Sequence, residues 1–210
     1  MSRQSDITEK TKKIYDAGVS EYRKSYIHVS RSAEDFIQYI PKGGKILEIG
    51  CGVGVDANFF AQKGHVVIAT DISSQMIRQA QKDYPHPNIT FLVADMFSLN
   101  FPNNEFDGLF GESCVMYAFK AEVPKLLKGF HKVLKKGGVL ELGLQEGVSQ
   151  EFFLPESFPP YEEALVNVFS RNESLELLKN AGFSLIKDWS TMPQPGQHPF
   201  KKLKIFARKV

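Results

Sequence analysis

Residues 46–56 read ILEIGCGVGVD and carry the strongest structural signal in the chain. An apolar run ends at Ile49, and three glycines follow at Gly50, Gly52 and Gly54. Glycine loses more conformational entropy on folding than other residues, so a cluster indicates unusual dihedral angles or a backbone that closely approaches another group. The stretch therefore predicts either a ligand-binding loop after a buried strand or a tight strand-to-helix turn.

The chain around this stretch alternates between apolar runs and segments with helical periodicity. Strands are predicted at residues 45–49, 65–70, 88–95, 106–113 and 137–144, and helices at residues 56–63, 74–83, 122–134 and 170–181. Strands that are apolar throughout and separated by helices are typical of a parallel sheet covered on both faces. Right-handed crossovers make such a sheet doubly wound.

Both ends of the chain depart from this alternation. The first forty residues are predicted to be helical, and Ser32 is the predicted N-cap of a helix that ends before Pro41. Runs at residues 183–189 and 201–210 flank a turn-rich stretch around residues 193–199, which predicts an antiparallel hairpin. The predicted fold class is α/β: a doubly wound, Rossmann-like, mostly parallel seven-stranded sheet with a C-terminal antiparallel hairpin and helices on both faces.

Composition excludes several classes of protein. The 210 residues are 42% hydrophobic, carry a formal net charge of +2 and include two cysteines. Two cysteines are too few for a disulfide framework, and the absence of a Cys/His cluster leads us to expect no metal site. The polar start lacks the apolar stretch of a signal peptide, and no apolar run approaches membrane-spanning length. We therefore expect a soluble, cytoplasmic protein with no membrane partner.

The basic C-terminal run allows two interpretations. It contains Lys201, Lys202, Lys204, Arg208 and Lys209. Such a run can bind nucleic acid, but charges on a strand at the periphery of a sheet usually provide solubility. We favour solubility, so nucleic acid is an unlikely partner.

Acidic residues follow the next two predicted strands. Ligands of a doubly wound sheet bind beyond the carboxyl ends of its strands, where the strand order reverses. The spacing G-x-G-x-G departs from the G-x-G-x-x-G fingerprint of dinucleotide-binding proteins. Asp71 ends the second strand, where an acid can accept hydrogen bonds from both ribose hydroxyls, and Asp95 ends the third. Asp71 could instead cap the following helix, but Ser73 can take that role.

In this order the residues resemble class I S-adenosylmethionine-dependent methyltransferases of the small-molecule type. LEIGCGVG at 47–54 is similar to the first motif of that family, TDIS at 70–73 to the second, and ADMFSLNFPNNEFDGLF at 94–110 to the third and fourth. LLKGFHKVLKKGGVLEL at 126–142 and the closing helix and hairpin continue the resemblance. Roughly residues 41–210 are covered.

The resemblance implies S-adenosyl-L-methionine as cofactor and S-adenosyl-L-homocysteine as product. It implies that Asp71 binds the ribose, that Ile72 and Met96 sandwich the adenine, and that Asp95 accepts a hydrogen bond from its amino group. Glu48 would orient the loop or the ammonium group of the cofactor. The residues implied for cofactor binding are Tyr15, Glu48, Gly50, Cys51, Gly52, Gly54, Asp71, Ile72, Ser73, Met76, Ala94, Asp95, Met96, Gly111 and Glu112.

The expected organisation is a single methyltransferase domain over residues 1–210. Its parts are an N-terminal helical cap at 1–40, a cofactor-binding core at 41–144, a substrate lid at 145–170 and a closing helix and hairpin at 171–210. The lid is expected because residues 148–170 combine prolines and phenylalanines without a clear period, and long loops in compact domains are commonly functional. A packed surface connection is the alternative.

The expected reaction is in-line transfer of a methyl group to a small-molecule acceptor. A general base is optional, and its candidates are Glu112, Tyr117 and His28. The alternatives are methylation of tRNA or protein and a non-catalytic, cofactor-binding regulatory role. A nucleotide-dependent oxidoreductase is disfavoured by the glycine spacing. The protein is expected to be a monomer or a homodimer.

Overall fold

The computed structural model describes residues 2–193 and 198–210. The helices are α1 (Arg3–Ser25), α2 (Ala33–Ile37), α3 (Val55–Gln62), α4 (Ser74–Asp83), α5 (Val123–Val133) and α6 (Arg171–Asn180), with short 3-10 turns η1 (Val115–Tyr117) and η2 (Lys120–Glu122). The strands are β1 (Lys45–Ile49), β2 (Val66–Asp71), β3 (Ile89–Val93), β4 (Phe106–Glu112), β5 (Leu134–Glu146), β6 (Gln150–Pro155), β7 (Glu163–Phe169), β8 (Phe183–Thr191) and β9 (Lys201–Lys209).

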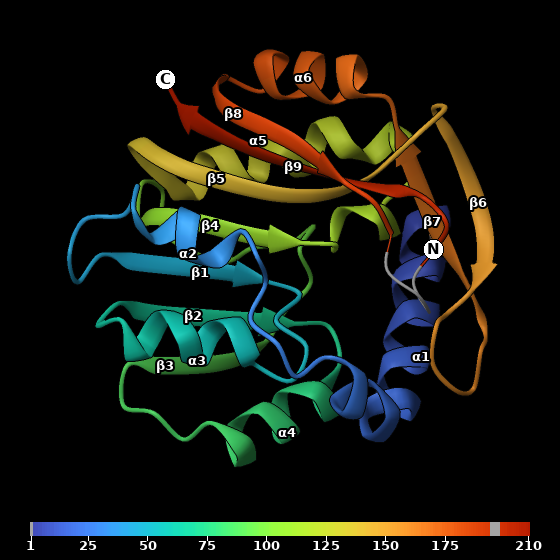
Figure 1. Ribbon diagram of the computed structural model, residues 1–210. Helices are drawn as coiled ribbons and strands as arrows, with labels where there is room; N and C mark the ends of the chain where they lie inside the picture. The colour runs from blue at the N-terminus through green and yellow to red at the C-terminus, as the bar shows by residue number, and fades with distance from the viewer. Residues whose placement is uncertain (1, 194–197) are drawn as a thin grey trace.

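All of these strands belong to one sheet (Figure 1). β3, β2, β1, β4 and β5 lie side by side and run parallel, while β9 pairs antiparallel with the opposite edge of β5 and carries β8. The chain moves outward from β1 to β3 and then returns to β4 on the other side of β1. The strand order therefore reverses between β1 and β4, where a doubly wound sheet binds its ligand.

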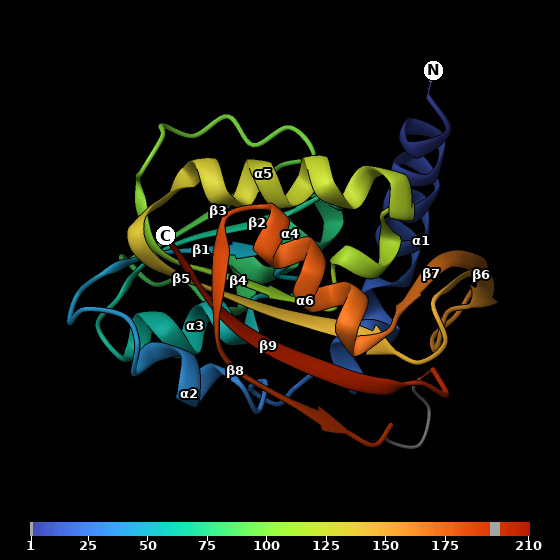
Figure 2. The ribbon, with the colours of Figure 1, turned by 90° about the horizontal axis from the view of Figure 1, so that it is seen from above.

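Helices cover both faces of the sheet, as the sequence predicted. Figure 2 shows α5 and α6 on one side and α2 and α3 on the other. Phe130 of α5 is fully buried in one hydrophobic core, and Phe36 of α2 and Phe60 of α3 are fully buried in the second. The two-sided burial explains why the strands read as apolar throughout. The predicted α/β, mostly parallel, doubly wound fold with its C-terminal hairpin is confirmed, but the described part of the sheet has nine strands rather than the predicted seven, because β6 and β7 add a hairpin. Residues 194–197 of the predicted C-terminal turn lie outside the described residues.

The segment at 145–170 differs from its prediction. It is not irregular: β6 and β7 form an antiparallel hairpin in which Phe152 is paired with Val166. β7 then pairs parallel with the last two residues of β5, beyond the point where β4 ends. The hairpin thus extends the sheet past the carboxyl end of β4 and lies beside α1 (Figure 1).

One further prediction at the N-terminus needs correction. The first forty residues are mostly helical, as predicted, and form two helices with a non-helical connection at 26–32. Ser32 precedes α2 but makes no side-chain cap, because its hydroxyl donates to Oε1 of Glu141 at 2.8 Å. Among the described residues, no helix is both long and apolar enough to cross a membrane.

Candidate cofactor and acceptor site

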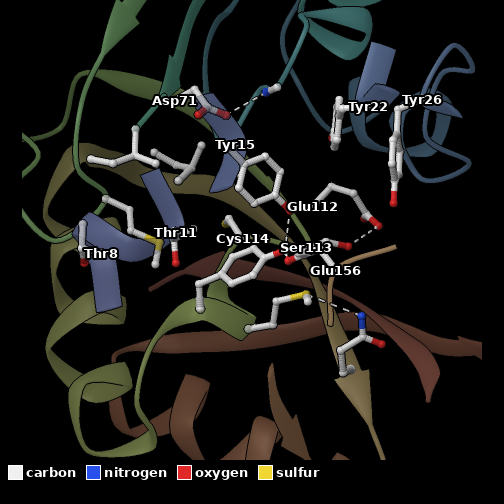
Figure 3. A pocket seen from close by; sticks show the side chains of 18 of the residues that line it. Thr8, Thr11, Tyr15, Tyr22, Tyr26, Asp71, Glu112, Ser113, Cys114 and Glu156 are labelled. Carbon is white, nitrogen blue, oxygen red and sulfur yellow. Dashed lines mark hydrogen bonds between the residues drawn. The ribbon is translucent and has the colours of Figure 1, made fainter. Parts of the chain in front are cut away.

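A pocket lies at the carboxyl ends of β1, β2 and β4, between α1 and the β6–β7 hairpin (Figure 3). We call it the central pocket; Asp71 and Gly52 line one part of it, and Gln145 and Glu156 line another. A second pocket lies beside it, and we call it the side pocket; its lining includes His28, Glu48, Cys51, Asp56 and Trp189. The two pockets share Gly50 and Glu112.

The glycine loop has the backbone that its sequence predicted. Gly50 and Gly52 have φ angles of +69° and +53°, in the left-handed region that other residues avoid. A Cβ at Gly52 would lie 2.9 Å from a ring carbon of Tyr22, and a Cβ at Gly50 would lie 3.0 Å from the Cβ of Cys114. The loop therefore needs glycine both for its dihedral angles and for space.

Asp71 receives backbone hydrogen bonds from both sides. Its Oδ2 accepts the amide N–H of Gly52 at 2.9 Å, and its Oδ1 accepts that of Ser73 at 2.8 Å. Burial raises the pKa of Asp71 to about 6, although these amide bonds oppose the rise. Ser73 is the N-cap of α4 through its own hydroxyl, as predicted, so the Asp71 carboxylate faces the central pocket.

The remaining predicted cofactor residues divide into two groups. Ile72, Ala94, Asp95 and Met96 line the central pocket together with Tyr15. The residues Gly54, Ser73, Met76 and Gly111 are outside both pocket linings. These four support the site: Gly54 precedes α3, Ser73 caps α4, Met76 is fully buried, and Gly111 packs against Leu142 and Cys114.

Glu48 and Asp56 form an acidic wall of the side pocket. Burial raises the pKa of Glu48 well above its usual value, and the charges of Asp56 and Asp71 add to the rise. Oε2 of Glu48 is buried and has no hydrogen-bond partner among the described residues. Burial also raises the pKa of Asp56 to about 6 despite two hydrogen bonds from Ser30. An orphaned carboxylate oxygen beside the glycine loop fits an incoming cationic group such as an ammonium.

Two lysines of β9 neutralise Glu112 at the end of β4. Lys204 and Lys202 both form ion pairs with its carboxylate, and Lys202 also donates to the hydroxyl of Ser113 at 3.3 Å. Burial opposes ionisation, but the two ammonium groups outweigh it and hold the pKa of Glu112 below its usual value. The prediction that these lysines are peripheral, solubilising charges is wrong, because β9 lies between β5 and β8 and Lys204 is only 6% exposed.

Two tyrosines and a glutamate form a chain of hydrogen bonds across the central pocket. Tyr117, after β4, donates to Oε1 of Glu156 at 2.8 Å, and the hydroxyl of Tyr15 on α1 bonds to that of Tyr117. Burial raises the pKa of both phenols well above the usual value, so both hydroxyls are protonated at neutral pH. The sequence prediction included Tyr15 and Tyr117 and missed Glu156.

Of the residues predicted on the acceptor side, Tyr117 and Glu112 line the central pocket, whereas His28 and the two lid phenylalanines do not. His28 lines the side pocket, whereas Tyr117 lines the central pocket and Glu112 lines both. Phe152 and Phe153 of the predicted lid are not lining residues; Glu156 and Ser157 represent that segment in the pocket. No periodic signal could have found Glu156, because its position depends on the pairing of β6 with β7.

Comparison with known proteins finds similarity to methyltransferases in the region of this site. Residues 46–138 match a sequence profile described as "Methyltransferase domain". An uncharacterized protein of Methanocaldococcus jannaschii is 29% identical over 190 residues, which cover 85% of each chain. An S-adenosyl-L-methionine-dependent Diels-Alderase of Talaromyces variabilis is 37% identical over 105 residues, which are 47% of this chain and 35% of that protein. The chain thus spans about a third of that second relative.

A solved structure shows the same fold over the whole chain. The 1,6-didemethyltoxoflavin-N1-methyltransferase of Burkholderia thailandensis, crystallised with 1,6-didemethyltoxoflavin and S-adenosylhomocysteine, has a TM-score of 0.79. The alignment covers 100% of this chain and 92% of that one at 19% identity. The fold, the matched profile over residues 46–138, the glycine loop and Asp71 are together consistent with a class I S-adenosylmethionine-dependent methyltransferase.

Proposed function

We propose that this protein transfers the methyl group of S-adenosylmethionine to a small-molecule acceptor. The observation that carries the proposal is the continuity of the central pocket. One pocket runs from Asp71 and Gly52 past Glu112 to Gln145 and Glu156. A cofactor held at the glycine loop and an acceptor held near the hairpin would then share one enclosed space.

The residues of the site fit the parts of the cofactor. Asp71 would accept the ribose hydroxyls, Ile72 and Met96 would flank the adenine, and Asp95 would accept from its amino group. The orphaned oxygen of Glu48 fits the ammonium group at the other end. When bound, S-adenosylmethionine supplies a methyl group that is already activated by a positively charged sulfur.

The task of the chain is to align and enclose the reactants. Proximity and orientation can contribute about 7–11 kcal/mol in favourable cases. α1 covers the pocket and is fixed to α4 by two hydrogen bonds from Arg23 to Asp83, at 2.6 and 2.9 Å. Ile14 of α1 packs with Phe158 and Ala164 of the hairpin segment. This cover excludes water and supports an acceptor small enough to be enclosed.

A screen for methyl transfer tests the proposal. The protein is incubated with methyl-labelled S-adenosylmethionine and, separately, with pools of small metabolites, bulk tRNA and a protein extract. Label recovered in a small molecule supports the proposal. Label recovered only in tRNA or protein contradicts the acceptor class, and cofactor binding without any label favours a regulatory role or another reaction.

A further inference from the structure

Glu156 is a buried carboxylate that no basic side chain neutralises. It is 5% exposed and follows β6 directly. Across residues 2–193 and 198–210, no lysine or arginine forms an ion pair with it. Glu112, in the same pocket, is held by two lysines. A buried charge is costly unless it is compensated, and Glu156 has no counter-charge within residues 2–193 and 198–210.

The hydrogen bonds around Glu156 have a definite direction. Tyr117 donates its proton to Glu156, so Tyr15 is the donor in the bond between the two phenols. The oxygen of Tyr117 then keeps one lone pair that can accept a hydrogen bond. A proton arriving at Tyr117 from the pocket can therefore move on to Glu156.

The groups that face Glu156 are aromatic. They are Tyr117 from η1, Tyr15 from α1 and Tyr26 directly after α1, and His198 lines the same pocket. The ring of Tyr15 lies 5.8 Å from that of Tyr117 and 5.3 Å from that of Phe158. Aromatic rings attract cations by the charge distribution of their faces. A carboxylate among tyrosines thus matches a positively charged ligand group.

We propose that the methyl acceptor is an amine, which binds as its ammonium form beside Glu156 and is methylated on nitrogen. This inference rests on the proposed function and adds the class of acceptor. Burial raises the pKa of Glu156 above its usual value, which makes the carboxylate a stronger base than an exposed one.

The chemical step follows from the chain of hydrogen bonds. The ammonium gives one proton to the oxygen of Tyr117, and Tyr117 passes its own proton to Glu156. The freed lone pair of the nitrogen forms a bond to the methyl carbon. The bond between that carbon and the sulfur breaks, and its electron pair stays on the sulfur, which becomes a neutral thioether. The products are the N-methylated amine in its ammonium form, S-adenosylhomocysteine and a proton on Glu156, which is later released to water.

Calorimetry on the full chain saturated with S-adenosylhomocysteine tests the inference. The probes are methylamine, propylamine, benzylamine and 2-phenylethylamine, each compared with the alcohol of the same skeleton. We expect at least one amine to bind about tenfold or more tightly than its alcohol, because a hydrogen bond between charged groups is stronger than one from a neutral hydroxyl. Glu156→Gln should abolish this preference, while Glu162→Gln, on an exposed residue of the same segment, should keep it.

A methyl-transfer assay with the amine that binds distinguishes the role of Glu156 in binding the amine from the role of Tyr117 in proton transfer. Tyr117→Phe keeps the charge of Glu156, so amine affinity should stay within about threefold, while the rate of labelled methyl transfer falls about tenfold or more. The inference is overturned if no amine binds more tightly than its alcohol, if the preference survives in Glu156→Gln, or if the bound amine gains no methyl group. Failure of S-adenosylhomocysteine to bind would instead contradict the proposed function.

Discussion

Replacing Asp71 by asparagine separates the two roles that the structure gives this side chain. The carboxylate accepts one amide N–H from the glycine loop and one from Ser73. Asparagine has a single acceptor oxygen, so one of the two amides loses its partner and faces an NH₂ group instead. The ribose would also meet a weaker acceptor.

The magnitude follows from these contacts. A hydrogen bond to a charged group contributes about 1.5–3 kcal/mol, which corresponds to a cofactor dissociation constant raised about 10- to 150-fold. One unsatisfied buried amide costs about 1–3 kcal/mol of folding stability. For a chain of this size that lowers the melting temperature by about 2–12 °C. Asp71→Asn should therefore fold but bind the cofactor weakly.

Titration calorimetry with S-adenosylhomocysteine between pH 5 and pH 8 measures the effect. The pKa of Asp71 is about 6, so wild-type affinity should fall below that pH as the carboxylate takes up a proton. Asp71→Asn should lose this pH dependence. Asp35→Asn, which removes a partly exposed ion pair with Lys187, is the control and should resemble the wild type. Wild-type affinity in Asp71→Asn, or an unchanged pH dependence, would refute the assignment of Asp71 to the ribose.

Three further predictions follow from other contacts. Gly52→Ala should lower the free energy of unfolding by about 1–2 kcal/mol through its backbone angle alone, and by more because the new Cβ meets the ring of Tyr22. In chemical unfolding, Gly52→Ala should therefore cost less in a Tyr22→Ala background than in the wild type; the same cost in both backgrounds would show that the Tyr22 ring moves aside freely. Burial raises the pKa of Glu141 to about 8, so the folded state holds an extra proton and the free energy of unfolding should fall between about pH 4.5 and pH 8. In Glu141→Gln the free energy of unfolding should fall less over this pH range than in the wild type. Parallel pH curves for the two proteins would contradict the shifted pKa. Hydrogen exchange at residues 148–170 should slow when S-adenosylhomocysteine binds with an acceptor, and equal exchange in both states would mean static packing.

The parts of the fold that depend on local pattern could be predicted from the sequence. The central parallel strands β1 and β4 are largely buried, so their apolar runs stand out, and the glycine loop is marked by residues whose φ angles require glycine. Asp71 follows a strand end directly. These signals lie within a few residues of the structure that they indicate.

The parts that depend on distant pairing could not be predicted. The β6–β7 hairpin is anchored to β5 by two residues, and the position of Glu156 depends on that attachment. Lys204 reads as a solubilising charge until β9 is placed between β5 and β8, which puts its ammonium against Glu112. The acceptor side of the site is therefore the part that required three-dimensional information.

Thermal unfolding with S-adenosylhomocysteine and with NAD tests most directly whether this site binds the cofactor of its family. At a concentration a hundredfold above the dissociation constant, binding to the native state adds about 2.7 kcal/mol of stability. This corresponds to a rise in melting temperature of about 5–11 °C. We predict that rise with S-adenosylhomocysteine and no rise with NAD. A rise with NAD and none with S-adenosylhomocysteine would contradict the assignment of the glycine loop and Asp71 to S-adenosylmethionine.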